Sequence, residues 1–387
     1  MPDRTLFRSG RETAADTADL AQRADDLQAI TDSLLASTDK LLAGLTDVAG
    51  STSAAEADLN KGAEGSLPEQ TVTVDQIKTS ATPAPTEPPA DSVVSGETTP
   101  EPTAAPTEAP QPDNSGTGET INVTMNGTAQ TMDLVQCLAM VAQNELGPNA
   151  PAEAYKAQCV ATHCWILSQS GYPSVLGAEP GAAALAAAQE VAHVLVTYNG
   201  QVCFTPYFAS ASTGTASAAE VWGNDRAWLQ AVDSPYDQSV SSHWNTNGNS
   251  SGTARFSRQT LQDRIRDVMD IDLSGVDPNS WFTIQSANQY GWVAKIQVGP
   301  DAGAGTVSGR WFRENLLARQ SVDGRSLRSQ CFTVSYNADL DCFIFDVYGY
   351  GHGCGMSQWG AIGYARNGWG YQDILTHYFV GTTITTY

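Results

Sequence analysis

Apolar side chains recur with regular spacing in two parts of the chain, residues 15–50 and residues 119–387. In the first part a large apolar residue returns at every seventh position, at Leu20, Leu27, Leu34, Leu41 and Val48. The second seam that a coiled coil needs is poor, because its positions include Arg23 and Gly44. The pattern predicts a marginal amphipathic helix over about 15–50 at a mobile end of the chain. The alternative is a helix that serves self-association or docking.

From residue 119 onward the pattern is typical of a packed domain that contains both helices and hairpins. Asn126-Gly127 and Asn199-Gly200 each separate two short strand-like segments, and Asn-Gly is typical of two-residue hairpin turns. Helical spacing of apolar residues predicts three helices, over 133–145, 152–169 and 181–193. After a long polar stretch, apolar segments predict strands at 295–298, 331–337 and 342–349. Because helices and strands do not alternate regularly, the expected fold class is α+β.

Between these two parts lies a segment rich in proline, threonine and glutamate, residues 79–118. Hydrophobic residues are almost absent from it, so it cannot bury enough apolar surface to offset the entropy lost on ordering. We expect an extended, disordered linker of partly polyproline character. The predicted organisation is therefore an N-terminal region over 1–78, a linker over 79–118 and a single domain over 119–387.

The charge and hydropathy of the chain exclude several classes of function. The net charge is −22, and there is no cluster of Lys and Arg of the kind that nucleic-acid binding requires. No apolar run approaches the roughly 18 residues of a membrane-spanning helix. Residues 1–15 lack the apolar core of a secretory signal. We expect a protein with no nucleic-acid partner and no visible signal peptide or transmembrane segment.

Seven cysteines are spread along the second part of the chain without a CxxC pair. Their odd number and their apolar surroundings favour buried thiols over a disulfide framework. Cys159 and His163 lie four residues apart on a predicted helix and share a face, as two metal ligands would. No second pair of ligands lies near them in the sequence, so we expect packed core residues, no metal and no cofactor.

Glu145 is a candidate catalytic acid on local grounds. It lies at the end of an apolar helix, just before Gly147 and Pro148. The negative end of the helix dipole and burial against the apolar helix would both raise its pKa. A carboxyl group that is protonated near neutral pH can act as a general acid. The same position also suits an exposed glutamate without a role.

The sequence GYGHGCGMSQWG, residues 349–360, combines glycines with groups that can bind a sugar. It matches no phosphate-binding motif. It offers the imidazole of His352, polar groups from Ser357 and Gln358, and an aromatic face from Trp359. Hydroxyl partners beside a flat apolar surface are typical of carbohydrate sites. Glycines could allow close approach of a sugar chain, or could serve a structural turn.

Three sequence blocks in this order resemble the stage II sporulation protein D family, also called the LytB amidase-enhancer family. The blocks are NELGPNAPAEAYKAQCVATHCWIL, YFASASTGTASAAEVWGNDRAWLQAVDSPYD and YGHGCGMSQWGAIGYARNGWGYQDILTHYFVGTTI. The resemblance covers about 119–387 and implies an α+β domain that acts on peptidoglycan outside the cytoplasm or in the cell wall. Sporulation members are lytic transglycosylases that cut glycan strands whose stem peptides have been removed by an amidase.

The resemblance also implies roles for particular residues. Glu145 matches the catalytic glutamate of the family and would be the general acid and base. The implied glycan-binding residues are His352, Ser357, Gln358, Trp222, Ser212, Lys156 and Gln158. The implied partners are peptidoglycan glycan strands and a cell-wall amidase. The alternative is a non-catalytic glycan-binding module that enhances an amidase.

Two departures from the family pattern concern substrate and metal binding. An Arg-Thr-Tyr sequence of the family is replaced here by His163-Cys164-Trp165. If that arginine and tyrosine help to hold the glycan, this protein would bind it differently or weakly. Sporulation members carry zinc ligands in the loop that follows, whereas residues 170–185 contain neither cysteine nor histidine. Zinc is therefore not expected.

Overall fold

A computed structural model of the protein describes residue 73 and residues 118–241, 253–300, 305–317 and 327–387. All of them belong to one of the two units into which the chain divides, residues 62–387. The predicted helix over about 15–50 lies outside the described residues, as does the predicted linker except for Gly118. Within the described residues no helix is both long enough and apolar enough to cross a membrane.

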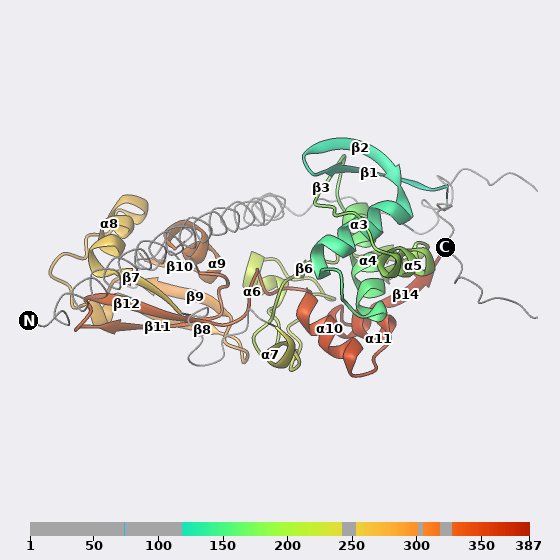
Figure 1. Ribbon diagram of the computed structural model, residues 1–387. Helices are drawn as coiled ribbons and strands as arrows, with labels where there is room; N and C mark the ends of the chain where they lie inside the picture. The colour runs from blue at the N-terminus through green and yellow to red at the C-terminus, as the bar shows by residue number, and fades with distance from the viewer. Residues whose placement is uncertain (1–72, 74–117, 242–252, 301–304, 318–326) are drawn as a thin grey trace, which may run out of the picture. The chain divides into compact units, whose positions relative to one another are not determined.

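Both helices and strands form the described part of the chain, which confirms the predicted α+β class (Figure 1). The elements of residues 118–241 are β1 (Thr120–Met125), β2 (Thr128–Asp133), α3 (Leu134–Leu146), α4 (Ala152–Leu167), β3 (Ser174–Val175), α5 (Ala182–Val191), β4 (Val194–Tyr198), β5 (Gln201–Val202), β6 (Tyr207–Phe208), α6 (Ala218–Trp222) and α7 (Asp237–Val240). Those of residues 253–317 are β7 (Thr253–Ser257), α8 (Arg258–Met269), η1 (Pro278–Ser280), β8 (Phe282–Ala287), β9 (Val293–Val298), β10 (Thr306–Ser308), α9 (Gly309–Trp311) and η2 (Phe312–Leu316). Those of residues 327–387 are β11 (Phe332–Asn337), β12 (Cys342–Val347), β13 (Met356–Ser357), α10 (Gln358–Arg366), α11 (Tyr371–Tyr378) and β14 (Thr383–Thr386).

Helix α4 is the central helix of the domain. It contacts α3, α5, β4 and the C-terminal helices α10 and α11, which lie beside it although they are far away in sequence (Figure 1). From Ala154 to Ile166 every residue except Lys156 is buried. A helix that is buried on all sides needs apolar or internally paired side chains around its whole circumference. This explains why the sequence of α4 shows no polar face.

The two predicted Asn-Gly hairpins are confirmed. Strands β1 and β2 pair antiparallel, and Asn126 and Gly127 between them have positive φ values of 49° and 83°. Strands β4 and β5 pair in the same way around Asn199 and Gly200, whose φ values are 52° and 77°. The second strand of this hairpin has two residues, and β4 also pairs with the C-terminal strand β14.

Two three-stranded sheets, β10-β9-β8 and β11-β12-β7, share a separate apolar core rich in aromatic residues. Its largest buried side chains include Trp281, Phe312, Phe343 and Phe345. The sequence predicted β9, β11 and β12, but it did not predict β7, α8 and β8, which lie in the long polar stretch, or β10, which follows β9. The reason is that α8 buries little more than Leu261 and Ile265, and β8 is mostly exposed.

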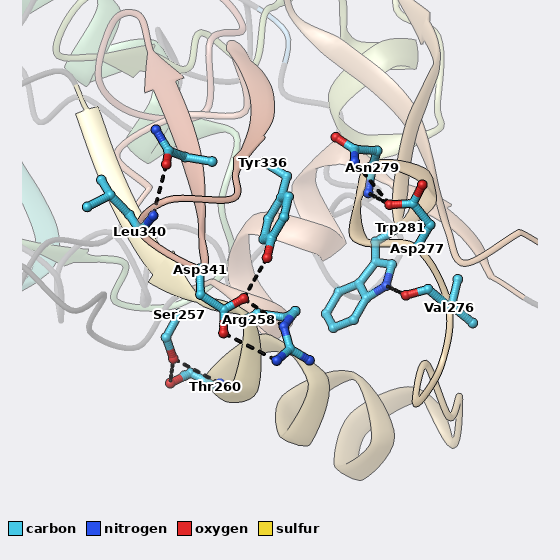
Figure 2. Close-up of polar contacts among 11 residues, drawn as sticks. Ser257, Arg258, Thr260, Val276, Asp277, Asn279, Trp281, Tyr336, Leu340 and Asp341 are labelled. Carbon is cyan, nitrogen blue, oxygen red and sulfur yellow. Dashed lines mark hydrogen bonds and ion pairs between the residues drawn. The ribbon is translucent and has the colours of Figure 1, made fainter.

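Polar contacts join the turn between β11 and β12 to the start of α8 (Figure 2). Asp341, which has a positive φ of 44°, accepts hydrogen bonds from Nε and Nη2 of Arg258 at 2.7 and 3.2 Å. The hydroxyl of Tyr336 donates to the same carboxylate at 2.6 Å. Ser257 caps α8 by accepting the N–H of Thr260 at 3.1 Å. These exposed or partly buried groups fix the corner of the sheet, away from the residues to which the sequence assigns a function.

Candidate functional site

Glu145 lies where the sequence predicted it, one residue before the end of α3. The helix ends because Gly147 adopts a positive φ of 76°, with its N–H donating to the carbonyl of Gln143. The hydroxyl of Tyr155, on α4, donates to the carbonyl of Gly147 and so holds this end of α3 against α4. The carboxyl group of Glu145 is thus presented, partly buried, from a fixed helix terminus.

The side chain of Gln358 contacts Glu145 directly. Its Nε2 donates a hydrogen bond to Oε2 of Glu145 at 2.7 Å. Gln358 is the first residue of α10 and is only 6% exposed, so its amide is held by the surrounding protein. A hydrogen bond from an amide stabilises the charged form of a carboxyl group. Two residues that are 213 positions apart, one in the first block and one in the third, therefore meet at one carboxylate.

Beneath Glu145 lies a small buried polar network that includes Tyr207. Burial, and then the negative charge of Glu145, raise the pKa of the Tyr207 phenol, against a hydrogen bond with Thr162 that lowers it. Thr162 in turn accepts a hydrogen bond from Nε2 of Gln158 at 3.2 Å. Gln158 is fully buried, and its Oε1 has no partner among the described residues. The structure thus places Gln158 in the core below the site, not at a surface that a glycan reaches.

His352 is held on the other side of Tyr207. Its Nδ1 accepts the N–H of Cys354 at 3.1 Å, so that Nε2 carries the proton and donates to the carbonyl of Tyr207 at 3.1 Å. Burial, and then the positive charge of Arg313, lower the pKa of His352 to about 3. The imidazole is therefore neutral at ordinary pH, and both of its nitrogens have backbone partners.

The ring of His352 lies between two aromatic side chains. The ring centroid of Phe208 is 5.5 Å away and that of Trp222 is 5.3 Å away. Trp222 is the last residue of α6 and is partly exposed, as a stacking surface must be. The structure thus pairs Glu145 with Gln358 and His352 with Trp222. Tyr207 relates the two pairs, because its carbonyl bonds to His352 and the pKa of its phenol responds to the charge of Glu145.

The glycines of the loop before α10 pack against protein. Gly349, Gly351, Gly353 and Gly355 all have positive φ, between 70° and 106°. A Cβ atom at any of them would come closer than 3.0 Å to an atom of residues 206–211 or of Trp292. The backbones also pair, since the N–H and carbonyl of Tyr350 bond to Ser210 at 2.7 and 3.0 Å. This corrects the hypothesis that the glycines make room for a sugar chain, because protein atoms occupy that space.

Comparison with known proteins supports the resemblance seen in the motifs. No protein-family model matches the chain. The chain is 24% identical over 285 residues to the amidase enhancer of Bacillus subtilis (strain 168), an alignment that covers 64% of this chain and 40% of that protein. It is 26% identical over 191 residues to stage II sporulation protein D of the same organism and to that of Bacillus amyloliquefaciens, covering 49% of this chain and 48% and 47% of theirs. The chain is a homologue of these proteins. It spans less than half of the length of the curated relatives that it matches.

In this homologue of stage II sporulation protein D, several predicted glycan-binding residues serve internal contacts. Ser357 is fully buried, and its Oγ donates to Oδ1 of Asp237 at 2.6 Å. Ser212 is buried and donates to the carbonyl of Tyr290 at 2.8 Å. The backbone N–H of Trp359 donates to a carbonyl of the 206–211 segment at 3.0 Å, and its side chain is partly exposed.

Lys156 is the one predicted glycan-binding residue that lies in a salt-bridge cluster. Its Nζ lies 2.6 Å from a carboxylate oxygen of Glu190 and 2.9 Å from one of Glu153. Hydrogen bonds to Glu190 and Glu153 raise its pKa. This arrangement ties α4 to α5 and leaves the ammonium group already paired.

Asp237 is a buried residue that the sequence analysis did not single out. Its carboxylate accepts hydrogen bonds from Ser234 and Ser357, both at 2.6 Å, from the N–H of Ala211 at 2.7 Å and from Ser210 at 3.1 Å. Burial raises its pKa to about 6, although these hydrogen bonds act in the opposite direction. It fixes the N-terminus of α10, and with it Gln358. The Asp-Ser-Pro-Tyr-Asp end of the central block was the available signal.

The cysteines and His163 lie in the core, as predicted. All seven thiols are free and buried. Burial, and then the charge of His193, lower the pKa of His163 to about 4, and its Nδ1 has no partner among the described residues. Over the part of the chain that the structure describes, no three His, Cys, Asp or Glu side chains come together as a metal site requires. The Cys159 thiol contacts the carbonyl of Leu138 at 3.7 Å.

Proposed function

We propose that this protein cleaves the glycan strands of peptidoglycan as a lytic transglycosylase, with Glu145 as general acid and base. The observation that carries the proposal is the 2.7 Å contact between Glu145 and Gln358. This contact joins, at a single carboxyl group, the first and the third of the sequence blocks that resemble the family. A structural glutamate at a helix end has no need of a partner from such a distant motif.

The chemistry requires one carboxyl group that can both give and take a proton. Protonated Glu145 donates its proton to the glycosidic oxygen as the bond from that oxygen to the anomeric carbon breaks. The C6 hydroxyl of the same sugar attacks the anomeric carbon and returns its proton to Glu145. The product carries a 1,6-anhydro ring, and no water is consumed. A second carboxylate, which two-carboxylate glycosidases need, has no role in this reaction.

Partly exposed aromatic side chains of the second and third sequence blocks are the proposed contacts of the glycan. Trp222 and Trp359 supply aromatic faces, and His352 orients Trp222. The buried Ser357, Ser212 and Gln158 support this surface from below. Gln358 has the double role of a positioning residue and a donor at the site.

The names of the relatives suggest where such a reaction takes place. They refer to sporulation and to the enhancement of an amidase. We infer a role in remodelling the cell wall, outside the cytoplasm, on glycan from which an amidase has removed the peptides.

A non-catalytic role as a glycan-binding amidase enhancer is the second candidate. It is favoured by the fact that the relative named amidase enhancer aligns with 64% of the chain, more than either sporulation protein does. Both functions require glycan binding, so only turnover separates them.

The test uses the full chain as wild type, Glu145→Gln and the control Glu179→Gln, which removes an exposed carboxylate elsewhere. Each is incubated with peptide-stripped and with intact peptidoglycan, and the products are analysed by mass spectrometry. Anhydro-muramic ends from the wild type and Glu179→Gln, but not from Glu145→Gln, would support the proposal. Equal cleavage by Glu145→Gln would refute the role of Glu145. Binding without cleavage by all three would establish the second candidate.

A further inference from the structure

A cavity of about 540 Å³ lies between α6 on one side and β9, β10, α9 and η2 on the other. Its volume is in the range typical of sites for small molecules. None of the predicted site residues except Trp222 lines it. The functions assigned so far therefore leave most of this cavity without a role.

The cavity is lined by the indole rings of Trp222 and Trp311, which are both partly exposed. Trp222 faces the cavity and also packs against His352, at 5.3 Å between ring centroids. Its Nε1 is buried and has no hydrogen-bond acceptor among the described residues. Large aromatic faces with a polar edge suit a ligand that has both apolar and hydroxyl-bearing surfaces, such as a sugar ring.

Among the described residues, the charges that line the cavity leave one cation without an ionic partner. Four charged side chains contribute, those of Glu220, Lys295, Arg310 and Glu314. Nε of Arg310 donates to both oxygens of Glu314, at 3.0 and 3.1 Å. Oε2 of Glu220 already accepts two N–H groups, at 2.8 and 3.0 Å. Lys295 is exposed on β9 and has neither an ion pair nor a side-chain hydrogen bond within the described residues.

We propose that this cavity is a saccharide subsite for a sugar that carries a carboxylate, with Trp222 and Trp311 against the ring and Lys295 paired with the carboxylate. The inference rests on the proposed function for the choice of sugar. Of the two sugars of peptidoglycan, N-acetylmuramic acid carries a carboxyl group and N-acetylglucosamine does not. That carboxyl group is free only where the peptide has been removed, because the peptide is attached through it. Lys295 would therefore select stripped glycan by its charge.

The test measures the binding of each monosaccharide to the ¹⁵N-labelled full chain through the indole N–H resonances. The probes are N-acetylmuramic acid and, as the neutral counterpart, N-acetylglucosamine. The variants are Lys295→Gln and the control Arg255→Gln, which removes an exposed strand cation outside the cavity. The free energy of an exposed or half-exposed ion pair corresponds to a preference of about fivefold for the charged sugar over the neutral one. We expect the wild type and Arg255→Gln to prefer N-acetylmuramic acid by about that factor, and the preference to weaken with added salt.

In Lys295→Gln we expect this preference to disappear while N-acetylglucosamine binds as before. Trp311→Ala should weaken both sugars about equally. Equal binding of the two sugars by the wild type, or an unchanged preference in Lys295→Gln, would overturn the proposal. The outcome is separate from that of the cleavage assay. If cleavage requires Glu145 but the protein shows no preference for N-acetylmuramic acid, the proposed function stands and the subsite is refuted. If the preference depends on Lys295 but no cleavage occurs, the subsite stands and the proposed function is refuted.

Discussion

Gln358 donates from Nε2 to Oε2 of Glu145 at 2.7 Å, across 213 residues of sequence. The two side chains extend from opposite kinds of helix terminus, since Glu145 lies near the C-terminal end of α3 and Gln358 opens α10. The contact therefore restrains the carboxyl group from outside its own helix. It also means that the position of Glu145 depends on how α10 is anchored.

Replacing Gln358 by leucine tests this dependence. The variant removes a donor that stabilises the ionised carboxylate, so the protonated form of Glu145 becomes relatively more favourable. We expect cleavage of stripped glycan to fall by about tenfold, because the carboxyl group loses its orientation, and the residual activity to extend to higher pH. The pH profile of the initial rate is the measurement.

The matched control is Gln372→Leu, which removes an exposed glutamine from α11. Its rate and profile should equal those of the wild type. A Gln358→Leu protein with lower activity but an unshifted pH profile would mean that the contact acts on structure alone.

Asp237 makes the stability of the protein depend on pH in a defined direction. Burial raises its pKa from 3.8 to about 6 in the folded protein. The folded state therefore binds a proton more readily than the unfolded state between these values, and stability falls as the pH rises through that range. The difference of about two units corresponds to about 3 kcal/mol.

Urea unfolding of the wild type and Asp237→Asn at pH values from 4 to 7 isolates this effect, because the other carboxyl groups are common to both. We expect the advantage of the wild type over the variant to shrink by about 3 kcal/mol from low to high pH. A constant difference across the range would show that Asp237 does not titrate there.

Gly353 and Gly368 form a matched pair for the loop before α10. Both have similar positive φ values, 85° and 86°, but a Cβ at Gly353 would strike the ring of Trp292 whereas one at Gly368 would meet nothing. Gly368→Ala should cost about 1 kcal/mol from backbone strain. Gly353→Ala should cost about 1–3 kcal/mol more, because the Trp292 ring has to move. If urea unfolding shows that both variants lose the same free energy of unfolding, the Trp292 ring can move without an energetic cost.

The seven buried thiols should react slowly with a thiol reagent in the folded protein. Burial raises the pKa of Cys137 and Cys331 to about 12, so almost no thiolate is present at neutral pH. Titration with a chromogenic disulfide should detect no fast-reacting group before urea is added and seven groups afterwards. Rapid labelling of the native protein would contradict the buried assignment.

The sequence was sufficient to predict those turns and helix ends that depend only on neighbouring residues. Asn126-Gly127 and Asn199-Gly200 are turns because Asn and Gly tolerate positive φ, and Gly147 ends α3 for the same reason. Glu145 could be placed at a helix end from its neighbours alone. Its link to Gln358 was not predictable from spacing, because that contact exists only once α3 and α10 pack around α4.

Residues that act through long-range contacts were missed or misassigned. Asp237 resembles any surface aspartate in sequence, and only its four donors, two of which lie on Ser210 and Ser357, reveal its role. Ser357, chosen for its hydroxyl group, proved to be one of those donors. The cavity beside Trp222 is lined by β9, β10 and α9, of which the sequence predicted only β9.

The glycines at 349, 351, 353 and 355 make their segment sensitive to insertions and deletions, because the positions that admit no Cβ atom alternate along the chain. A substitution disturbs one contact, whereas deletion of a single residue moves side chains such as those of Tyr350 and His352 into positions that have no room for a side chain. A deletion of two residues would shorten the loop but keep a glycine at each of the remaining crowded positions. The segment should therefore tolerate changes of length in steps of two far better than in steps of one, a constraint that no inspection of single residues reveals.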